Sequence, residues 1–199
     1  MPRKKINPWF KAESNAVVAI DNSRSTSNWS NLSVEIENLA LARAEKAKAA
    51  RNGKSVKIIQ NHEQSELVHS GGRYLVQPPL VGRDAALLEN RLKSASVSSV
   101  VVCREPVTSL GFCPVVALGS GVIVRVHVEE PKNPKKPTCA WFDHAVEELG
   151  DHVLEQLNQD SPIQRQLDYL LAHFSAVPTY QRAYHRAIDL CNTLSHESV

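Results

Sequence analysis

Short apolar runs, separated by helix-like stretches, constrain the fold of this chain most strongly. Continuous runs occupy 16–20 (AVVAI) and 98–103 (SSVVVC), and further strand-like segments lie at 55–60 and 121–128. A continuous apolar run of this length is typical of a strand that is buried on both faces of a parallel sheet. We therefore expect an α/β fold in which helices flank a mostly parallel central sheet.

Amphipathic stretches alternate with these strands. Apolar residues recur at helical spacing over 30–51, and this stretch ends at an Arg-Asn-Gly sequence that is typical of a helix C-terminus. A second helix is expected over 82–95, and a short hairpin over 65–76 that turns at its glycine pair. The strand, helix and strand between 16 and 60 predict a β–α–β unit with a right-handed crossover.

Composition divides the chain into three parts. Residues 1–15 are polar and basic and are expected to form a tail, whereas 16–135 would form the α/β domain. Proline residues interrupt the chain at 131–137. Three amphipathic stretches follow, so 139–199 is expected to be a helical C-terminal region.

The overall composition is that of an ordinary globular protein. The apolar fraction is 42%, the charged fraction is 22% and the formal net charge is +2, so charge alone indicates no particular partner. The four cysteines form no CxxC pair, which favours reduced thiols and a cytoplasmic location. No segment approaches the roughly 20 apolar residues that span a bilayer, and no secretory signal is recognisable, so no membrane partner is expected.

Three side chains with oxygen atoms follow the first expected strand at alternate positions: Asp21, Ser23 and Ser25. In an open α/β sheet, ligands bind outside the carboxyl ends of the strands. Hard divalent cations prefer oxygen ligands. The D-x-S-x-S pattern is therefore a candidate cation site, and the alternative is a polar turn that leads into the following helix.

The same pattern resembles the von Willebrand factor A (VWA) domain. VVAIDNSRS resembles the D-x-S-x-S signature of its metal-ion-dependent adhesion site (MIDAS). ARNGKSVKII, VQPPLVGRDAALLENRLKSA and GVIVRVHVEEP are similar, in order, to segments of bacterial VWA-like proteins encoded beside MoxR-type AAA+ ATPases. The resemblance covers about residues 16–131.

The resemblance implies a VWA/Rossmann-like fold and a protein–protein interaction module, an adaptor in a multiprotein or AAA+ ATPase-linked assembly, with no catalytic residues. It implies that Mg²⁺, Mn²⁺ or Ca²⁺ is held by Asp21, Ser23 and Ser25, with Glu105 acting directly or through water. The site is degenerate, because Glu105 stands where the family has Asp and the family's loop threonine has no counterpart.

Two other functions stay open. The protein could be a metal-free scaffold, or a nucleic-acid-binding protein that uses basic residues in its tail and proline-rich segment. These residues, which could also contact an acidic protein, are Arg3, Lys4, Lys5, Lys132, Lys135 and Lys136. The second alternative is an RNase H-like metal-dependent nuclease in which Asp21 and Glu105 hold the metal. No phosphate-binding loop, dinucleotide motif or nucleophile elbow is present.

Overall fold

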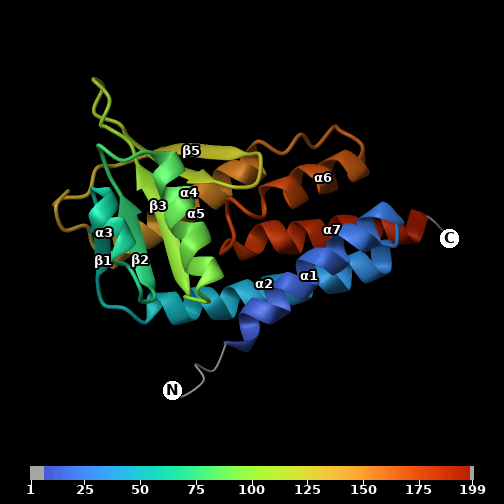
Figure 1. The fold of residues 1–199 in the computed structure, drawn as a ribbon. Coiled ribbons are helices and arrows are strands. Elements are labelled where there is room, and N and C mark those ends of the chain that lie inside the picture. Colours follow the sequence, from blue (N-terminus) through green and yellow to red (C-terminus); the bar gives the residue numbers. More distant parts are fainter. Residues whose placement is uncertain (1–6, 198–199) are drawn as a thin grey trace, which may run out of the picture.

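The structure, a computed structural model, describes residues 7–197 of the chain. A helical hairpin comes first, a five-stranded sheet with two short crossovers follows, and three helices complete the chain (Figure 1). In order, the elements are α1 (Pro8–Ser25), α2 (Trp29–Arg51), β1 (Val56–Ile59), α3 (His62–Glu66), β2 (Gly72–Val76), α4 (Gly82–Ser94), β3 (Ser99–Arg104), β4 (Cys113–Leu118), β5 (Ile123–Val128), α5 (Cys139–Glu155), α6 (Ile163–His173) and α7 (Gln181–Glu197).

The sheet is mixed, with the strands in the order β1-β2-β3-β4-β5. β1, β2 and β3 are parallel, whereas β4 and β5 continue the sheet as an antiparallel meander. The α/β class is therefore confirmed. The parallel arrangement is limited to the first half of the sheet, because β3, β4 and β5 follow one another through loops without an intervening helix.

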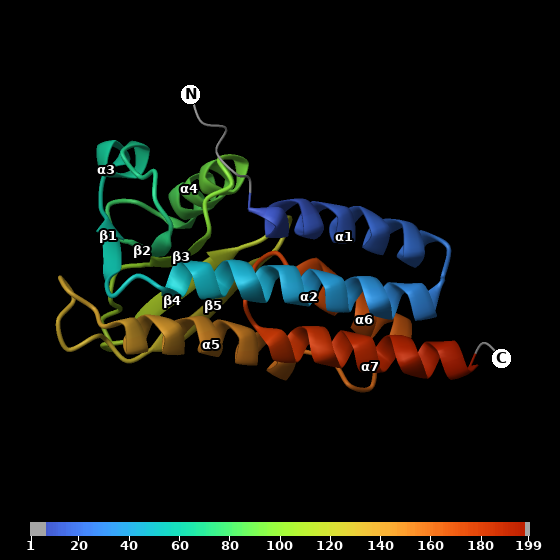
Figure 2. The same ribbon diagram turned by 90° about the horizontal axis from the view of Figure 1, so that it is seen from below.

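Helices cover the two faces of the sheet unequally. On one face, Leu88 and Leu92 of α4 pack against Tyr74, Cys103 and Val116 of the sheet. On the other face, α5 and the hairpin α1–α2 form a larger core with α6 and α7. Figure 2 shows α1, α2 and α7 side by side, extending well beyond the sheet. The N-terminal part of α1 and the C-terminal half of α2 lie nearer the sheet, and together with α4 they line one cavity.

The expected first strand at 16–20 is wrong, because this run lies within helix α1. The Asn7 side chain caps the helix by accepting a hydrogen bond from the backbone N–H of Trp9, and proline occupies the first turn. Ala16 and Ile20 are buried at helical spacing, whereas Val18 between them is 58% exposed. The β–α–β unit expected over 16–60 is wrong for the same reason, and most of the described part of the expected tail is helical.

The other periodic segments are confirmed. The helices expected over 30–51 and 82–95 are α2 and α4, and three helices occupy the C-terminal region. The hairpin expected over 65–76 is wrong, because its second half, β2, pairs in parallel with β1 and with β3. Strand β4 was not predicted from the sequence. Pro114 has no backbone N–H to donate, which disfavours a strand, but its carbonyl oxygen accepts a hydrogen bond from the Glu105 N–H.

Candidate functional site

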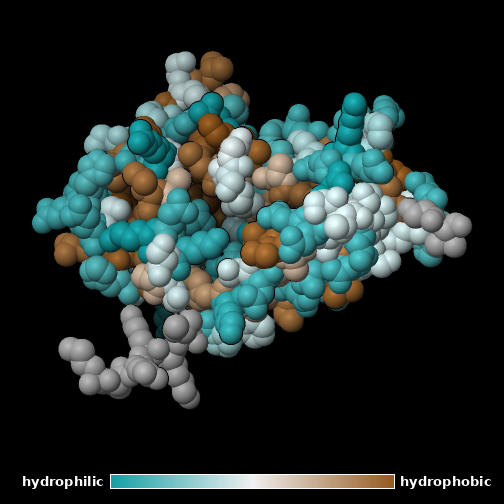
Figure 3. Space-filling model, turned by 45° about the vertical axis from the view of Figure 1, so that its right-hand side comes forward, coloured by the Kyte–Doolittle hydropathy of each residue, from teal (hydrophilic) through white to brown (hydrophobic). Residues whose placement is uncertain are grey.

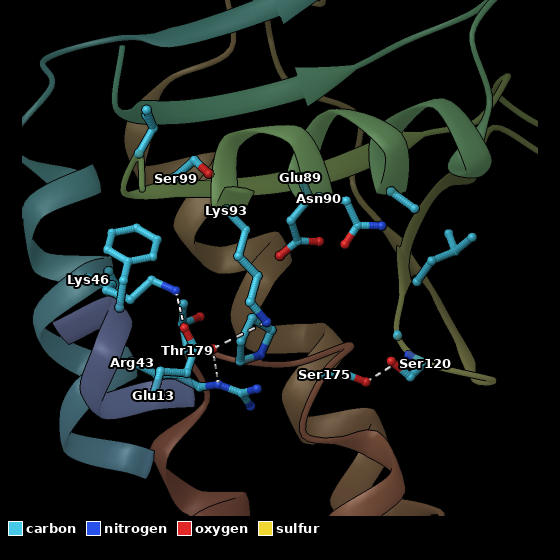
Figure 4. Close-up of a pocket in the computed structure, with 17 residues that line it drawn as sticks. Glu13, Arg43, Lys46, Glu89, Asn90, Lys93, Ser99, Ser120, Ser175 and Thr179 are labelled. Atoms are coloured by element: carbon cyan, nitrogen blue, oxygen red, sulfur yellow. Dashed lines mark hydrogen bonds and ion pairs between the residues drawn. The ribbon is translucent and has the colours of Figure 1, made fainter. Parts of the chain in front are cut away.

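A cavity of about 240 Å³ lies where α1, α2 and α4 meet the β4–β5 turn and the loop between α6 and α7. We call it the Arg43 cavity. Figure 4 shows Glu89 and Lys93 reaching into it from α4, with Glu13, Arg43 and Lys46 on the side of the helical hairpin. The remaining wall carries hydroxyl groups from the β4–β5 turn and the α6–α7 loop.

Arg43 is the centre of the polar network. Its side chain is 7% exposed, and its Nε donates to Oε1 of Glu13 at 2.9 Å. Nη1 donates to the Phe174 carbonyl oxygen at 2.6 Å and to the Tyr184 hydroxyl at 2.8 Å. Nη2 has no hydrogen-bond partner in the described part of the chain, and it is not among the buried atoms that lack one. This nitrogen is therefore free to donate to a group in the cavity.

Arg43 occupies the buried stripe of α2, at helical spacing from Ile36, Leu39 and Ala47. Glu13 lies in the same way on the buried stripe of α1. Although burial alone would raise the pKa of Glu13, the charges of Arg43 and Lys46 hold it below its ordinary value. Glu13 is therefore ionised at neutral pH and compensates one of the surrounding cations.

Two lysines add to the positive charge around Glu13. The Lys46 ammonium donates to Oε2 of Glu13, and its pKa is lowered, chiefly by burial. The Lys93 ammonium lies 3.9 Å from Oε1 of Glu13 and its side chain is 55% exposed. Arg43, Lys46 and Lys93 thus share a single ionised carboxylate.

Glu89 is a second carboxyl group at the cavity, and it makes no hydrogen bond or ion pair with the other described residues. Its half-buried side chain also borders a small inner hollow of about 20 Å³ with an apolar lining that includes Val100 and Leu149. Burial raises the pKa of Glu89 to about 7, against the opposing charges of Arg43 and Lys93. Near neutral pH, Glu89 can therefore either donate or accept a proton.

The wall formed by the β4–β5 turn and the α6–α7 loop is neutral and polar. It includes Ser120, Ser175 and Thr179. The Ser120 backbone N–H donates to the Ser175 hydroxyl at 2.8 Å, which ties the two loops together (Figure 4). A Cβ at Gly119 would lie 2.4 Å from the Ser175 Oγ, so this approach requires glycine. The wall is held rigidly and presents hydroxyl groups to a ligand.

The residues expected to hold a cation lie in a different setting. Asp21 is exposed on α1, the Ser23 hydroxyl is buried and accepts from Asn31 Nδ2 at 2.6 Å, and the Ser25 hydroxyl donates to the Asn22 carbonyl at 2.8 Å. Successive residues of a helix are rotated by about 100°, so alternate positions point to opposite sides. The prediction that these side chains lie in a strand-to-helix loop is therefore wrong, because they lie on helix α1.

Glu105 follows β3 and forms an ion pair with Arg125 at 2.8 Å. Neighbouring Arg104 lies 3.4 Å from Glu130. Within 7–197, no three His, Cys, Asp or Glu side chains are arranged to hold a metal ion. The downstream carboxylate Asp143, a candidate third ligand for a nuclease, is held by Arg73 at 2.8 and 3.0 Å. The structure thus shows other partners for these acidic groups.

The basic residues divide between described and undescribed parts of the chain. Lys132, Lys135 and Lys136 are exposed in the segment that joins β5 to α5. Arg3, Lys4 and Lys5 lie outside the described residues. The nucleic-acid contact expected of this set stays a prediction.

Sequence reasoning missed all five charged residues of the Arg43 cavity: Glu13, Arg43, Lys46, Glu89 and Lys93. The helical periodicity of the sequence does indicate two of these residues. Arg43 and Glu13 each stand where the apolar periodicity of a helix calls for a buried residue. Charged residues are almost never fully buried unless they are paired, so two such positions of opposite sign indicate a buried ion pair.

Among residues 7–197, no helix is both long and apolar enough to cross a membrane. The chain matches no protein-family model, no curated protein and no solved structure.

Proposed function

We propose that this protein binds a small anionic ligand in the Arg43 cavity. The observation that carries the proposal is the free Nη2 of buried Arg43, in a cavity where three cations share one ionised carboxylate. An anion in the cavity could accept charge-assisted hydrogen bonds from this nitrogen, and such bonds are stronger than neutral ones. Two unit charges about 4 Å apart attract by roughly 4 kcal/mol near a protein surface, which favours such a ligand.

The size of the cavity restricts the ligand. Its volume of about 240 Å³ lies below the roughly 300–1,000 Å³ of sites for drug-sized molecules. The hydroxyl groups on the loop wall provide neutral hydrogen bonds beside the cations. A small polar anion therefore fits this lining better than an apolar or extended molecule.

Calorimetric titration with sulfate, phosphate and acetate at constant ionic strength tests the proposal. We expect saturable binding, and Lys93→Met should weaken it about tenfold or more, because a hydrogen bond to a charged group contributes roughly 1.5–3 kcal/mol. Lys93 is suitable because its side chain is 55% exposed and its contact with Glu13 is long.

Lys54→Met is the matched control, since Lys54 is exposed and lies outside the cavity lining. It removes the same charge and should leave affinity unchanged. Sulfate also stabilises proteins without binding a site, so thermal shifts alone are insufficient. Absence of saturable binding by every anion, or equal affinities of the two lysine variants, would refute the proposal.

A second function, docking of a protein partner, is favoured by exposed apolar side chains at one end of the sheet. The β3–β4 loop extends beyond the sheet in Figure 1, and apolar atoms appear at its tip in Figure 3. Leu110 is 80% exposed and Phe112 is 50% exposed, and both belong to this loop. Exposed apolar surface of this kind marks interaction sites. It supports the adaptor role without requiring a metal, and an AAA+ ATPase as partner stays a prediction.

The double variant Leu110→Ser, Phe112→Ser separates this docking role from stability. Both side chains are exposed, so the melting temperature should hardly change. Crosslinking through the loop should identify the native partner, and the double variant should lose affinity for it. Undiminished affinity would remove the docking role.

A further inference from the structure

We propose that the ligand of the Arg43 cavity is a tetrahedral dianion, phosphate or a small phosphate ester, and that Glu89 binds it as a neutral carboxylic acid that donates a hydrogen bond. This inference rests on the proposed function and specifies its ligand. It goes further by giving a role in recognition to Glu89, which makes no hydrogen bond or ion pair within residues 7–197.

The charge of the cavity favours a dianion. Arg43, Lys46 and Lys93 are cationic, and ionised Glu13 compensates one of them, so two positive charges are left without a partner. A dianion balances them, whereas a simple carboxylate balances only one. The Arg43 Nη2, which has no hydrogen bond with the described residues, can donate to this dianion.

The distribution of donors favours a tetrahedral shape. Cationic groups reach the cavity from α2 and α4, while Ser120 and Ser175 lie on the opposite side, where the two loops meet (Figure 4). A planar carboxylate presents two oxygens in one plane. The oxygens of a phosphoryl group point in several directions and can meet both walls at once. Charge-assisted hydrogen bonds from Arg and Lys are the usual means of binding such groups.

Glu89 fits this ligand only in its neutral form. An ionised carboxylate beside a dianion would repel it, whereas a protonated one has an O–H to donate. The apolar hollow beside Glu89 already favours the neutral form, and its pKa of about 7 reflects that burial. A bound dianion would raise the pKa further, so binding should be accompanied by proton uptake at Glu89.

Charged and polar groups face Glu89 from several surrounding elements. Glu13 of α1 opposes its ionisation, whereas Arg43 and Lys46 of α2 and Lys93 of α4 favour it. The sheet and the α6–α7 loop contribute only Ser99, Ser120, Ser175 and Thr179 as polar side chains. No histidine lines the cavity, so Glu89 is the group expected to titrate in the neutral range.

Sulfate is the first probe, because it stays dianionic across the pH range and does not add its own titration. Calorimetric titration from pH 5.5 to 8.5 at constant ionic strength should give constant affinity at the acid end. Above the pKa of free Glu89, affinity should fall by up to about tenfold per pH unit. Glu89→Gln keeps a neutral donor at all pH values, so its affinity should stay nearly level and exceed the wild-type affinity at pH 8.5 by up to about 30-fold.

Glu37→Gln, which alters an exposed glutamate of α2, is the matched control and should retain the wild-type profile. Glu89→Ala removes the donor and should bind more weakly than Glu89→Gln at every pH. Circular dichroism verifies that each variant is folded. Lys46, whose pKa is also lowered, is present in both the wild type and Glu89→Gln, so a difference between these profiles reports the loss of the Glu89 carboxyl group.

The outcomes are distinct. Parallel pH profiles of the wild type and Glu89→Gln would overturn the role of Glu89 while leaving anion binding intact. Acetate affinity equal to that of sulfate would overturn the assignment of a dianion. Failure of every anion to bind would refute the proposed function itself. Inorganic phosphate and glycerol 3-phosphate at pH 7.5, where both are mainly dianionic, then distinguish free phosphate from an ester, and tight binding of either supports the proposal.

Discussion

Arg43→Met should be among the most destabilising single substitutions in the described part of the chain. The substitution keeps a long apolar stem but removes hydrogen bonds to Glu13, to the Phe174 carbonyl and to the Tyr184 hydroxyl. The last two groups lie in the α6–α7 region, so Arg43 of α2 connects that region to α1. Loss of these bonds loosens the packing of the helical layer as well as the cavity.

The magnitude follows from burial. Removing one partner of a buried ion pair costs about 3–5 kcal/mol, because the remaining charge loses its compensation. Arg43 and Glu13 have side-chain exposures of only 7% and 5%, so solvent cannot replace the missing donor fully. Lys46 still pairs with Glu13, which places the expected loss near the lower end, about 3 kcal/mol.

Urea unfolding measures this loss. With a slope of roughly 2 kcal/mol per molar urea, 3 kcal/mol lowers the midpoint by about 1.5 M while the slope is unchanged. Arg165→Met is the matched control, since Arg165 is exposed and its side chain has no hydrogen bond or ion pair with the described residues, and its effect should stay within about 0.5 kcal/mol. The double variant Glu13→Gln, Arg43→Met should lose less than the two single effects added together, because neither member of the Glu13–Arg43 pair then remains buried without the other.

An Arg43→Met variant as stable as Arg165→Met would refute the reasoning. Such a result would mean that the contacts of the guanidinium contribute nothing net to folding. Additive effects of the Glu13 and Arg43 substitutions would show that the two side chains act independently.

Two further predictions concern the cavity wall and its carboxyl groups. Gly119→Ala should cost about 1–3 kcal/mol in thermal or urea unfolding, because its Cβ would lie 2.4 Å from the Ser175 Oγ and 2.7 Å from the Ala176 N; Gly53→Ala, with no atom nearer than 3.9 Å, should be nearly neutral. Because the folded-state pKa of Glu13 is lowered, the stability it contributes is present above its ordinary pKa and is lost as the pH falls through the folded-state value; Glu13→Gln should flatten the stability profile there. The pKa of Glu89 is raised to about 7, so stability should fall as pH rises from about 4.5 to 7, and Glu89→Gln should remove that fall; an unchanged profile in either variant would contradict the assignment.

Local periodicity predicted much of the fold, and its failure at α1 has a physical cause. A five-residue apolar run is equally compatible with a buried strand and with one side of a helix. In the structure, Val18 is 58% exposed while Ala16 and Ile20 are buried, which is a helical pattern. The cap at Asn7 and the buried Glu13 precede the apolar run, so evidence for the helix lay outside the segment that suggested a strand.

The loop expected to hold a cation depended on the strand at 16–20. Asp21, Ser23 and Ser25 were expected to share one side of that loop, whereas a helix turns alternate residues to opposite sides. The Arg43 cavity had the opposite difficulty. Its charged residues come from α1, α2 and α4 and are separated by up to 80 positions, from Glu13 to Lys93. No short motif unites them, and only tertiary packing brings them together.

The composition of the Arg43 cavity favours a binding role over a purely structural one. A buried ion pair is weak evidence for stability, since well-packed apolar residues often stabilise a core equally well. A structural pair would also be complete with Arg43 and Glu13 alone. Here Lys46 and Lys93 approach the same carboxylate and repel each other and Arg43. Glu89 meanwhile is half-buried and makes no hydrogen bond or ion pair with the other described residues. Both features cost stability in the empty protein, and both are relieved when a dianion enters and accepts hydrogen bonds from the cations and from protonated Glu89.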